Sequence, residues 1–124
     1  MKSIIVSMFA AAGLMVAGSV LAADMPDAAK KNGCTACHAI DKKVVGPAWM
    51  DVSKFYNGKM EKSAGGKSVK EATGGKAPAE WLLTKVSKGG SGNWGSTPMI
   101  PNDPSGSKQA DIKGLVDFVL GLAK

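Results

Sequence analysis

Large apolar residues recur at helical spacing in several segments of the chain, and no segment shows the alternation typical of a strand. Residues 49–56 and 78–88 each predict a helix, the second opened by a proline at the position where helices tolerate one. Residues 107–124 predict a longer amphipathic helix with Ser107 as its N-cap. Residues 27–32 predict a short helix whose acidic residue precedes its lysines, the order that the helix dipole favours. We therefore expect an all-α protein of about four helices around a common centre.

Two long segments between these helices lack the periodicity. Residues 57–76 are rich in Lys, Gly and Ser, and they predict a mobile surface excursion with one helical turn at residues 69–72. This segment is either a docking surface or a tolerated insertion, and we favour the insertion. Residues 89–106 are rich in glycine and proline, and a loop of that length inside a small domain is usually functional or disordered.

The beginning of the chain has the layout of a secretory signal peptide. A lysine at position 2 precedes an uncharged apolar run, which ends in small residues around Ala22. The run is long enough for a retained membrane anchor, but the polar residues after it favour cleavage after Ala22. We therefore expect residues 1–22 to be a signal peptide and residues 23–124 to form one small domain in the periplasm.

The charge of the chain says little about a specific partner. Its formal net charge is +6, and all sixteen basic residues are lysines. Nucleic-acid-binding proteins depend on arginine for bidentate contacts, so the absence of arginine from the sequence argues against DNA or RNA as a partner. An excess of lysine suits solubility or salt-dependent attraction to an acidic protein. A solvated face without any partner explains each single lysine equally well.

The two cysteines and the one histidine of the chain, Cys34, Cys37 and His38, fall within five consecutive positions. A thioredoxin-type dithiol requires a strand before the motif, and a structural zinc site requires four ligands where only three are offered. A disulfide would close a very small loop and leave the histidine unexplained, but it stays the second alternative. Covalent attachment of haem c uses all three residues: each thiol bonds one vinyl group and the histidine becomes an iron ligand.

Iron bound by His38 needs a ligand on its opposite face, and the chain has no second histidine. Methionine, lysine, water and an open position are the alternatives. Met99 is the best candidate because it lies between prolines in a long loop, far from His38 in the sequence. A thioether ligand stabilises ferrous iron and so raises the reduction potential. The other methionines after the expected cleavage site are Met25, Met50 and Met60.

The order of these motifs resembles the small class I bacterial c-type cytochromes, the cytochrome c-551/c-552 group, also called c8. The stretches CTACHAI, VGPAWMDV and NWGSTPMIPN carry the resemblance, which spans nearly all of residues 23–124. It implies a small monohaem cytochrome c fold, with about four helices wrapped round one covalently bound haem c. Members often have proline directly after the methionine; Ile100 stands there in this chain, which loosens the loop.

The same resemblance implies roles for three further residues. The backbone carbonyl of Pro47 would accept the second ring N–H of His38, and Trp94 would donate its indole N–H to a haem propionate. Asn102 would hydrogen-bond the sulfur of Met99. From the residues alone, each has a plainer interpretation: an ordinary turn, core packing and a loop cap.

An iron with His38 and Met99 as ligands has no open position for a substrate, and the sequence offers no distal histidine or arginine to polarise a peroxide. We therefore expect an electron carrier, not an enzyme. The resemblance implies a soluble, monomeric shuttle between a membrane quinol oxidase and a terminal reductase or oxidase. Two alternatives stay open: a haem-binding sensor or catalytic protein with an open or exchangeable sixth site, and a haem-free disulfide module used for interaction.

Overall fold

The computed structural model describes residues 24–124, so the expected signal peptide lies outside the described residues. The elements, in chain order, are α2 (Asp27–Lys31), the 3-10 turn η2 (Cys34–Ala36), α3 (Trp49–Tyr56), α4 (Val69–Thr73), α5 (Pro78–Lys88) and α6 (Gln109–Gly121). Residues 24–124 contain no strand, and their only β-type pairings are two isolated bridges, one between His38 and Lys43 and one between Gly90 and Met99. The prediction of an all-α fold is confirmed.

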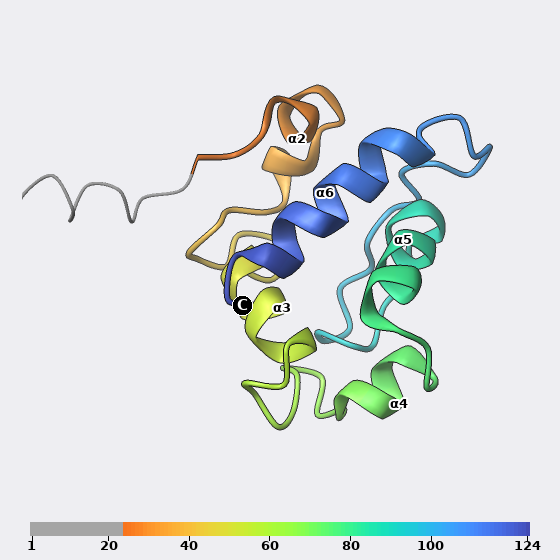
Figure 1. Cartoon of the computed structure of the whole chain (residues 1–124). Coiled ribbons are helices and arrows are strands. Elements are labelled where there is room, and N and C mark those ends of the chain that lie inside the picture. Colours follow the sequence, from red (N-terminus) through yellow and green to blue (C-terminus); the bar gives the residue numbers. More distant parts are fainter. Residues whose placement is uncertain (1–23) are drawn as a thin grey trace, which may run out of the picture.

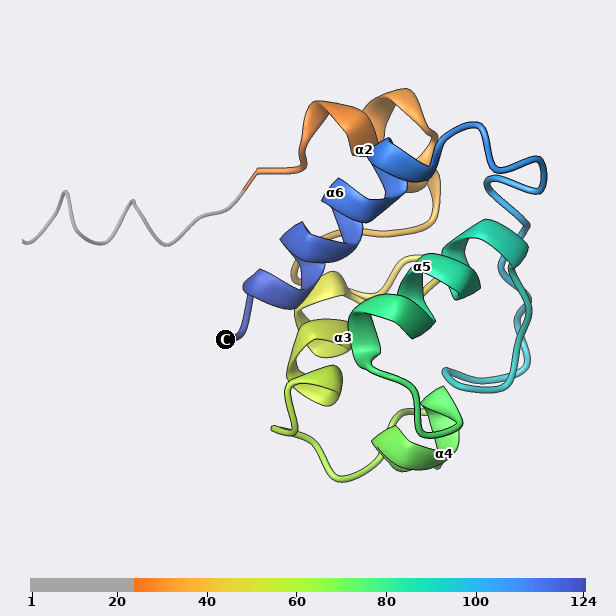
Figure 2. The same ribbon diagram turned by 45° about the vertical axis from the view of Figure 1, so that its right-hand side comes forward.

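Helix α6 runs across the molecule and packs mainly on α5 and α3, while α2 lies beside its N-terminal half (Figure 1). The short α4 lies at the opposite end from α2, a placement that the turned view also shows (Figure 2). The buried cluster joins Ala29, Trp49, Val52, Phe55, Tyr56, Ala72, Leu82, Ile112, Leu115, Val116 and Val119. Among the described helices, none is long and apolar enough to cross a membrane.

Helices α3 and α5 begin and end where their apolar spacing predicts. The turn expected within residues 57–76 is helix α4, which Ser68 and Glu71 open with a reciprocal capping box. The left-handed Gly74 then ends this helix.

The start of the last helix differs from the prediction. Helix α6 begins at Gln109, and the exposed Ser107 does not cap it. The carboxylate of Asp103 takes that place, because its Oδ2 accepts the backbone N–H of Lys108 at 2.9 Å and the side-chain Nε2 of Gln109 at 2.7 Å. The loop before the helix folds back and places an acceptor from further upstream at the start of the helix. The prediction of Ser107 as the N-cap was therefore wrong.

Replacing Asp103 by alanine is expected to lower the thermal unfolding midpoint by about 4–8 °C, the shift typical of losing one helix cap in a domain of this size. The bonds from Gln109 and the backbone also lower the pKa of the Asp103 carboxyl. A lowered folded-state pKa means that this stability is present above the ordinary carboxyl range and is lost as the pH falls through the lowered value. Thermal melts of Asp103→Ala and the control Ser107→Ala at neutral and acidic pH measure both effects. Equal melts at neutral pH would contradict the assignment.

Candidate functional site

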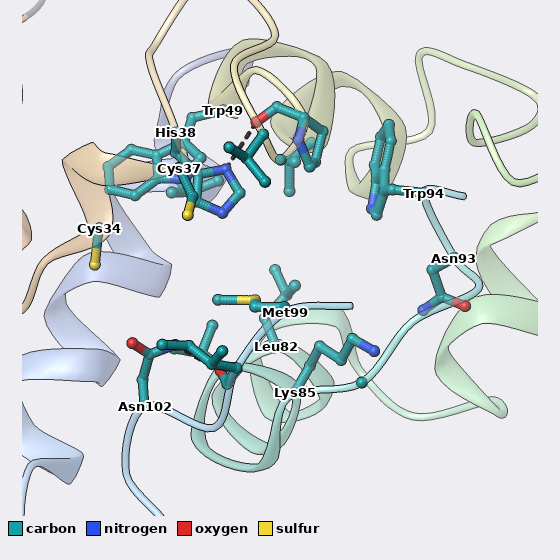
Figure 3. Close-up of a pocket in the computed structure, with 18 of the residues that line it drawn as sticks. Cys34, Cys37, His38, Trp49, Leu82, Lys85, Asn93, Trp94, Met99 and Asn102 are labelled. Carbon is teal, nitrogen blue, oxygen red and sulfur yellow. Dashed lines mark hydrogen bonds between the residues drawn. The ribbon is translucent and has the colours of Figure 1, made fainter. Parts of the chain in front are cut away.

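One cavity brings together the residues that the sequence singles out. Cys34, Cys37, His38, Pro47, Trp94, Met99 and Asn102 all line it. Apolar side chains of α3, α5 and α6 form much of the remaining wall, namely Val52, Leu82, Val86, Leu115, Val116 and Val119. Figure 3 shows His38 and Met99 on facing walls, with Cys34 at one end of the cavity and Trp94 at the other.

Cys34 begins the 3-10 turn that follows α2, and Cys37 directly follows this turn. Gly33 adopts a left-handed conformation (φ 76°), which lets the chain leave the helix and enter this turn. The backbone N–H groups of Cys37 and His38 both donate to the carbonyl of Cys34, at 3.1 and 2.9 Å. No disulfide joins Cys34 and Cys37. This short turn presents both sulfur atoms and the imidazole to the same cavity.

The imidazole of His38 is held in one orientation. Its Nδ1 lies 2.8 Å from the carbonyl oxygen of Pro47. A carbonyl can only accept, so Nδ1 carries the proton and the lone pair of Nε2 is free to bind a metal ion. Behind the ring, a Cβ at Gly46 would lie 2.5 Å from Cε1 of His38, so only glycine fits there. The residues of the loop after the attachment motif therefore set both the tautomer and the position of the ring.

Met99 is placed by pairing within the long loop. Its backbone N–H donates to Gly90 at 2.9 Å, and the N–H of Gly90 donates back to Met99 at 3.0 Å. Gly89, with φ 73°, approaches so closely that a Cβ there would lie 2.4 Å from the carbonyl oxygen of Met99. The thioether points into the cavity toward His38 (Figure 3). Among the methionines of residues 24–124, Met99 alone lines the cavity.

Asn102 lies in the cavity wall but faces a different acceptor from the one we expected. Its side-chain amide donates to the carbonyl of Ile100 at 3.0 Å, and its backbone N–H donates to Val86 at 3.1 Å. No hydrogen bond joins it to the sulfur of Met99 in residues 24–124. A bond to this sulfur therefore stays a prediction, and the contacts observed are those of a loop anchor.

The end of the cavity away from Cys34 is polar, and sequence reasoning missed most of it. Lys85 and Asn93 line this end with Trp94 (Figure 3). Tyr56 also lines the cavity, and its hydroxyl lies near the side chains of Asn93 and Trp94. Burial is the main cause that lowers the pKa of the Lys85 ammonium and raises that of the Tyr56 hydroxyl. A signal for Lys85 was present, because it occupies a position on the otherwise apolar face of α5.

These residues fit a flat, mostly apolar group with reactive positions on one edge and anionic groups on the other. The thiols of Cys34 and Cys37 can bond the reactive edge, and His38 and Met99 can ligate a central iron from its two faces. A structural zinc site is not supported, because no cluster of at least three His, Cys, Asp or Glu residues within residues 24–124 is arranged to hold a metal ion. The donor set is that of a haem c site.

Comparisons with known proteins agree with this assignment. The chain is 38% identical to cytochrome c-552 of Nitrosomonas europaea over 122 residues, which cover 98% of this chain and 99% of that protein. It is 40% identical to cytochrome c-551 of Allochromatium vinosum over 94 residues, 76% of this chain and 81% of that protein. The crystal structure of wild-type Nitrosomonas europaea cytochrome c552 matches with a TM-score of 0.59 and 38% identity, over 77% of this chain and 96% of that one. No family model matches the chain.

The all-α fold and the cavity with its attachment motif define a small c-type cytochrome. The chain belongs to the cytochrome c-551/c-552 family. It accordingly carries one covalently attached haem c and is an electron carrier, not an enzyme.

Replacing Gly46 by alanine is expected to push the imidazole of His38 away from Pro47 and to destabilise the haem-loaded protein by about 1–3 kcal/mol, the usual cost of overpacking. Guanidinium denaturation measures the change. Gly114→Ala is the matched control, because a Cβ at that helical position meets nothing within 4 Å. Equal stabilities of the two variants would contradict the close fit of Gly46 against His38.

Proposed function

We propose that His38 and Met99 are the axial ligands of the haem iron and that the protein carries single electrons between respiratory redox proteins of the periplasm. One observation carries this proposal: the oriented imidazole of His38 and the thioether of Met99 face each other across the cavity that also holds both cysteines. The haem supplies an iron that changes between the ferric and ferrous states.

The other residues around the cavity would anchor the haem, orient its ligands and bind its propionates. Cys34 and Cys37 would anchor one edge of the haem by thioether bonds, which prevents loss of the cofactor. The Pro47 carbonyl keeps the proton of His38 on Nδ1, so that Nε2 can stay bound in both oxidation states. Met99 is a soft, neutral ligand that favours ferrous iron. Trp94, at the other end, would donate its indole N–H to a propionate.

The mouth of the cavity is suited to brief encounters with partner proteins. Val45 is 49% exposed and Ile100 is 73% exposed, and both line the cavity. Exposed apolar side chains at the mouth, within a lysine-rich surface, fit small and short-lived electron-transfer interfaces. We propose a membrane quinol oxidase as donor and a terminal reductase or oxidase as acceptor, with the carrier itself a monomer.

Replacing Met99 by alanine is expected to preserve the covalent haem while abolishing the weak long-wavelength absorption band of methionine-bound ferric iron. The reduction potential should fall by on the order of 0.1 V, a part of the ~0.8 V range over which axial ligands set haem potentials. Added imidazole should bind the variant more tightly than it binds the natural protein. Redox-dependent spectra of both proteins measure these effects, with Met50→Ala as the control because Met50 lies outside the cavity lining.

The same spectra separate the competing functions. A natural protein that already lacks the band and shows high-spin ferric iron would point to an exchangeable sixth site, and so to a sensor or catalytic protein. Protein without haem absorbance after denaturation would overturn the cytochrome assignment altogether.

We also propose that export removes residues 1–22. Intact-mass measurement of the protein recovered from the periplasm is expected to place its N-terminus at Ala23, with the mass of one haem added. Ala22→Leu should slow this cleavage because the small exit position is lost. Haem-loaded protein that retains Met1 and stays with the membrane fraction would contradict the proposal.

A further inference from the structure

The polar end of the cavity gathers hydrogen-bond donors around one hydroxyl group. Tyr56 is only 6% exposed and lines the same cavity as Asn93 and Trp94. The indole N–H groups of Trp81 and Trp94 and the amide of Asn93 lie near its hydroxyl. These N–H groups oppose the rise in the Tyr56 pKa that burial causes. Their approach falls short of full hydrogen bonds within residues 24–124, and the buried Nε1 of Trp81 has no partner there.

This cluster has more donors than acceptors. Among the side chains that line this end of the cavity, those of Trp94 and Lys85 can only donate, and the Tyr56 hydroxyl can also donate. Asn93 uses one amide N–H toward the carbonyl of Ala72 at 3.4 Å, which leaves its second N–H available. Buried donors are stabilised when an acceptor satisfies them, and an ionised oxygen is the strongest acceptor. The chemistry of this end therefore calls for a carboxylate.

Residues 57–76 support the cluster from outside. The backbone N–H of Gly65 donates to the carbonyl of Asn93 at 3.1 Å, and Asn93 in turn reaches Ala72 of α4. A Cβ at Gly65 would lie 2.2 Å from the carbonyl oxygen of Gly92, so the two backbones are in close contact. Ser63 and Thr73 are buried in the same segment. The segment is therefore attached to the loop of Asn93 and Trp94, and its interpretation as a mobile excursion does not fit these contacts.

We propose that the Tyr56 hydroxyl and the Asn93 amide, beside Trp94, bind the carboxylate of a haem propionate, and that residues 57–76 hold this cluster in place by docking on Asn93. The inference rests on the haem site proposed above and adds two carboxylate-binding residues and a role for this segment. Tyr56 and Asn93 act as positioning residues: they set the charge and the orientation of the propionate end and do not touch the iron ligands.

The test compares two hydroxyl deletions on the same helix. Tyr56→Phe removes the proposed donor and keeps the ring, whereas Ser53→Ala removes a buried hydroxyl that bonds the Leu120 carbonyl and does not line the cavity. Without its donor the propionate bears more negative charge and favours ferric iron. We expect Tyr56→Phe to change the ferric-to-ferrous ratio at fixed applied potential about threefold, equivalent to ~28 mV at 59 mV per tenfold. Ser53→Ala should leave this ratio unchanged.

A second variant and a second measurement keep the result interpretable. Asn93→Asp has nearly the same shape but places a carboxylate against the propionate, so the potential should fall further. Ferric-minus-ferrous infrared spectra of protein with carbon-13 at the haem propionates should show shifted carboxylate bands in Tyr56→Phe and Asn93→Asp, and not in Ser53→Ala. Unchanged potential and unchanged bands in both cluster variants would overturn the carboxylate assignment.

The supporting role of residues 57–76 has its own pair of variants. Gly65→Ala must displace the backbone at Gly92 and should shift the potential and the propionate bands in the same direction as Tyr56→Phe. Gly114→Ala, which adds the same methyl group in open space, should shift neither. No shift in Gly65→Ala would overturn the supporting role. The proposed function is tested separately. If these variants carry haem and keep the methionine–iron band, the proposed function stands even when the potential and the propionate bands do not shift. Protein without haem would refute that function.

Discussion

The site depends on the 2.8 Å hydrogen bond between Nδ1 of His38 and the carbonyl of Pro47. This bond closes the loop that follows the attachment motif, in which the N–H of Gly46 also donates to the carbonyl of Cys37 at 2.8 Å. It determines which nitrogen of the ring is available, and the close contact with Gly46 determines the ring's position. The two thiols, which belong to the same short turn, are thereby placed relative to the imidazole. The cavity wall opposite His38 then needs to provide only one further iron ligand, facing the imidazole.

The cavity has two chemically different ends, and this difference orients a bound cofactor. The thiols at one end can form covalent bonds, while the hydrogen-bond donors at the other end can bind anionic oxygen. Between them lie apolar side chains of α3, α5 and α6, which exclude water and strengthen the electrostatic interactions at the polar end. A haem inserted the wrong way round would bring its propionates to the thiol end and leave the donors at the polar end without an anionic acceptor. With the proposed propionate contacts, the polypeptide would favour one orientation before any thioether bond forms.

Much of the fold could be predicted because its signals are local. Apolar spacing and an early proline mark residues 78–88, and Cys34, Cys37 and His38 are conspicuous because the chain has no other thiol or imidazole. The start of α6 could not be predicted in this way. Ser107 has the right chemistry for a cap, but the course of the loop brings Asp103 to the helix instead. A sequence pattern identifies residues that could cap a helix, but it does not show which of them the folded loop places at the helix N-terminus.

The polar end of the site depends on contacts between distant residues, so the sequence did not reveal it. A single tyrosine at the end of an amphipathic helix is equally consistent with core packing, and only the fold brings Asn93 and Trp81 to Tyr56. The attachment of Gly65 to Asn93 likewise joins two glycine-rich segments whose composition indicates mobility. Composition indicates how mobile a segment would be on its own. Here the close contact between the backbones of the two segments restricts that mobility.

The loop that carries Met99 has no helix or sheet of its own, yet hydrogen bonds anchor it at several points. Gly90 pairs with Met99, Asn102 donates to Val86 of α5, and Gly65 donates to Asn93. Elements joined in this way open together, so the loop, the end of α5 and residues 57–76 should form one cooperative unit in native-state hydrogen exchange. With Met99 as the proposed iron ligand, release of the iron–sulfur bond would require the opening of that whole unit. The lifetime of the proposed iron–sulfur bond would thus depend on the local stability of residues 57–76.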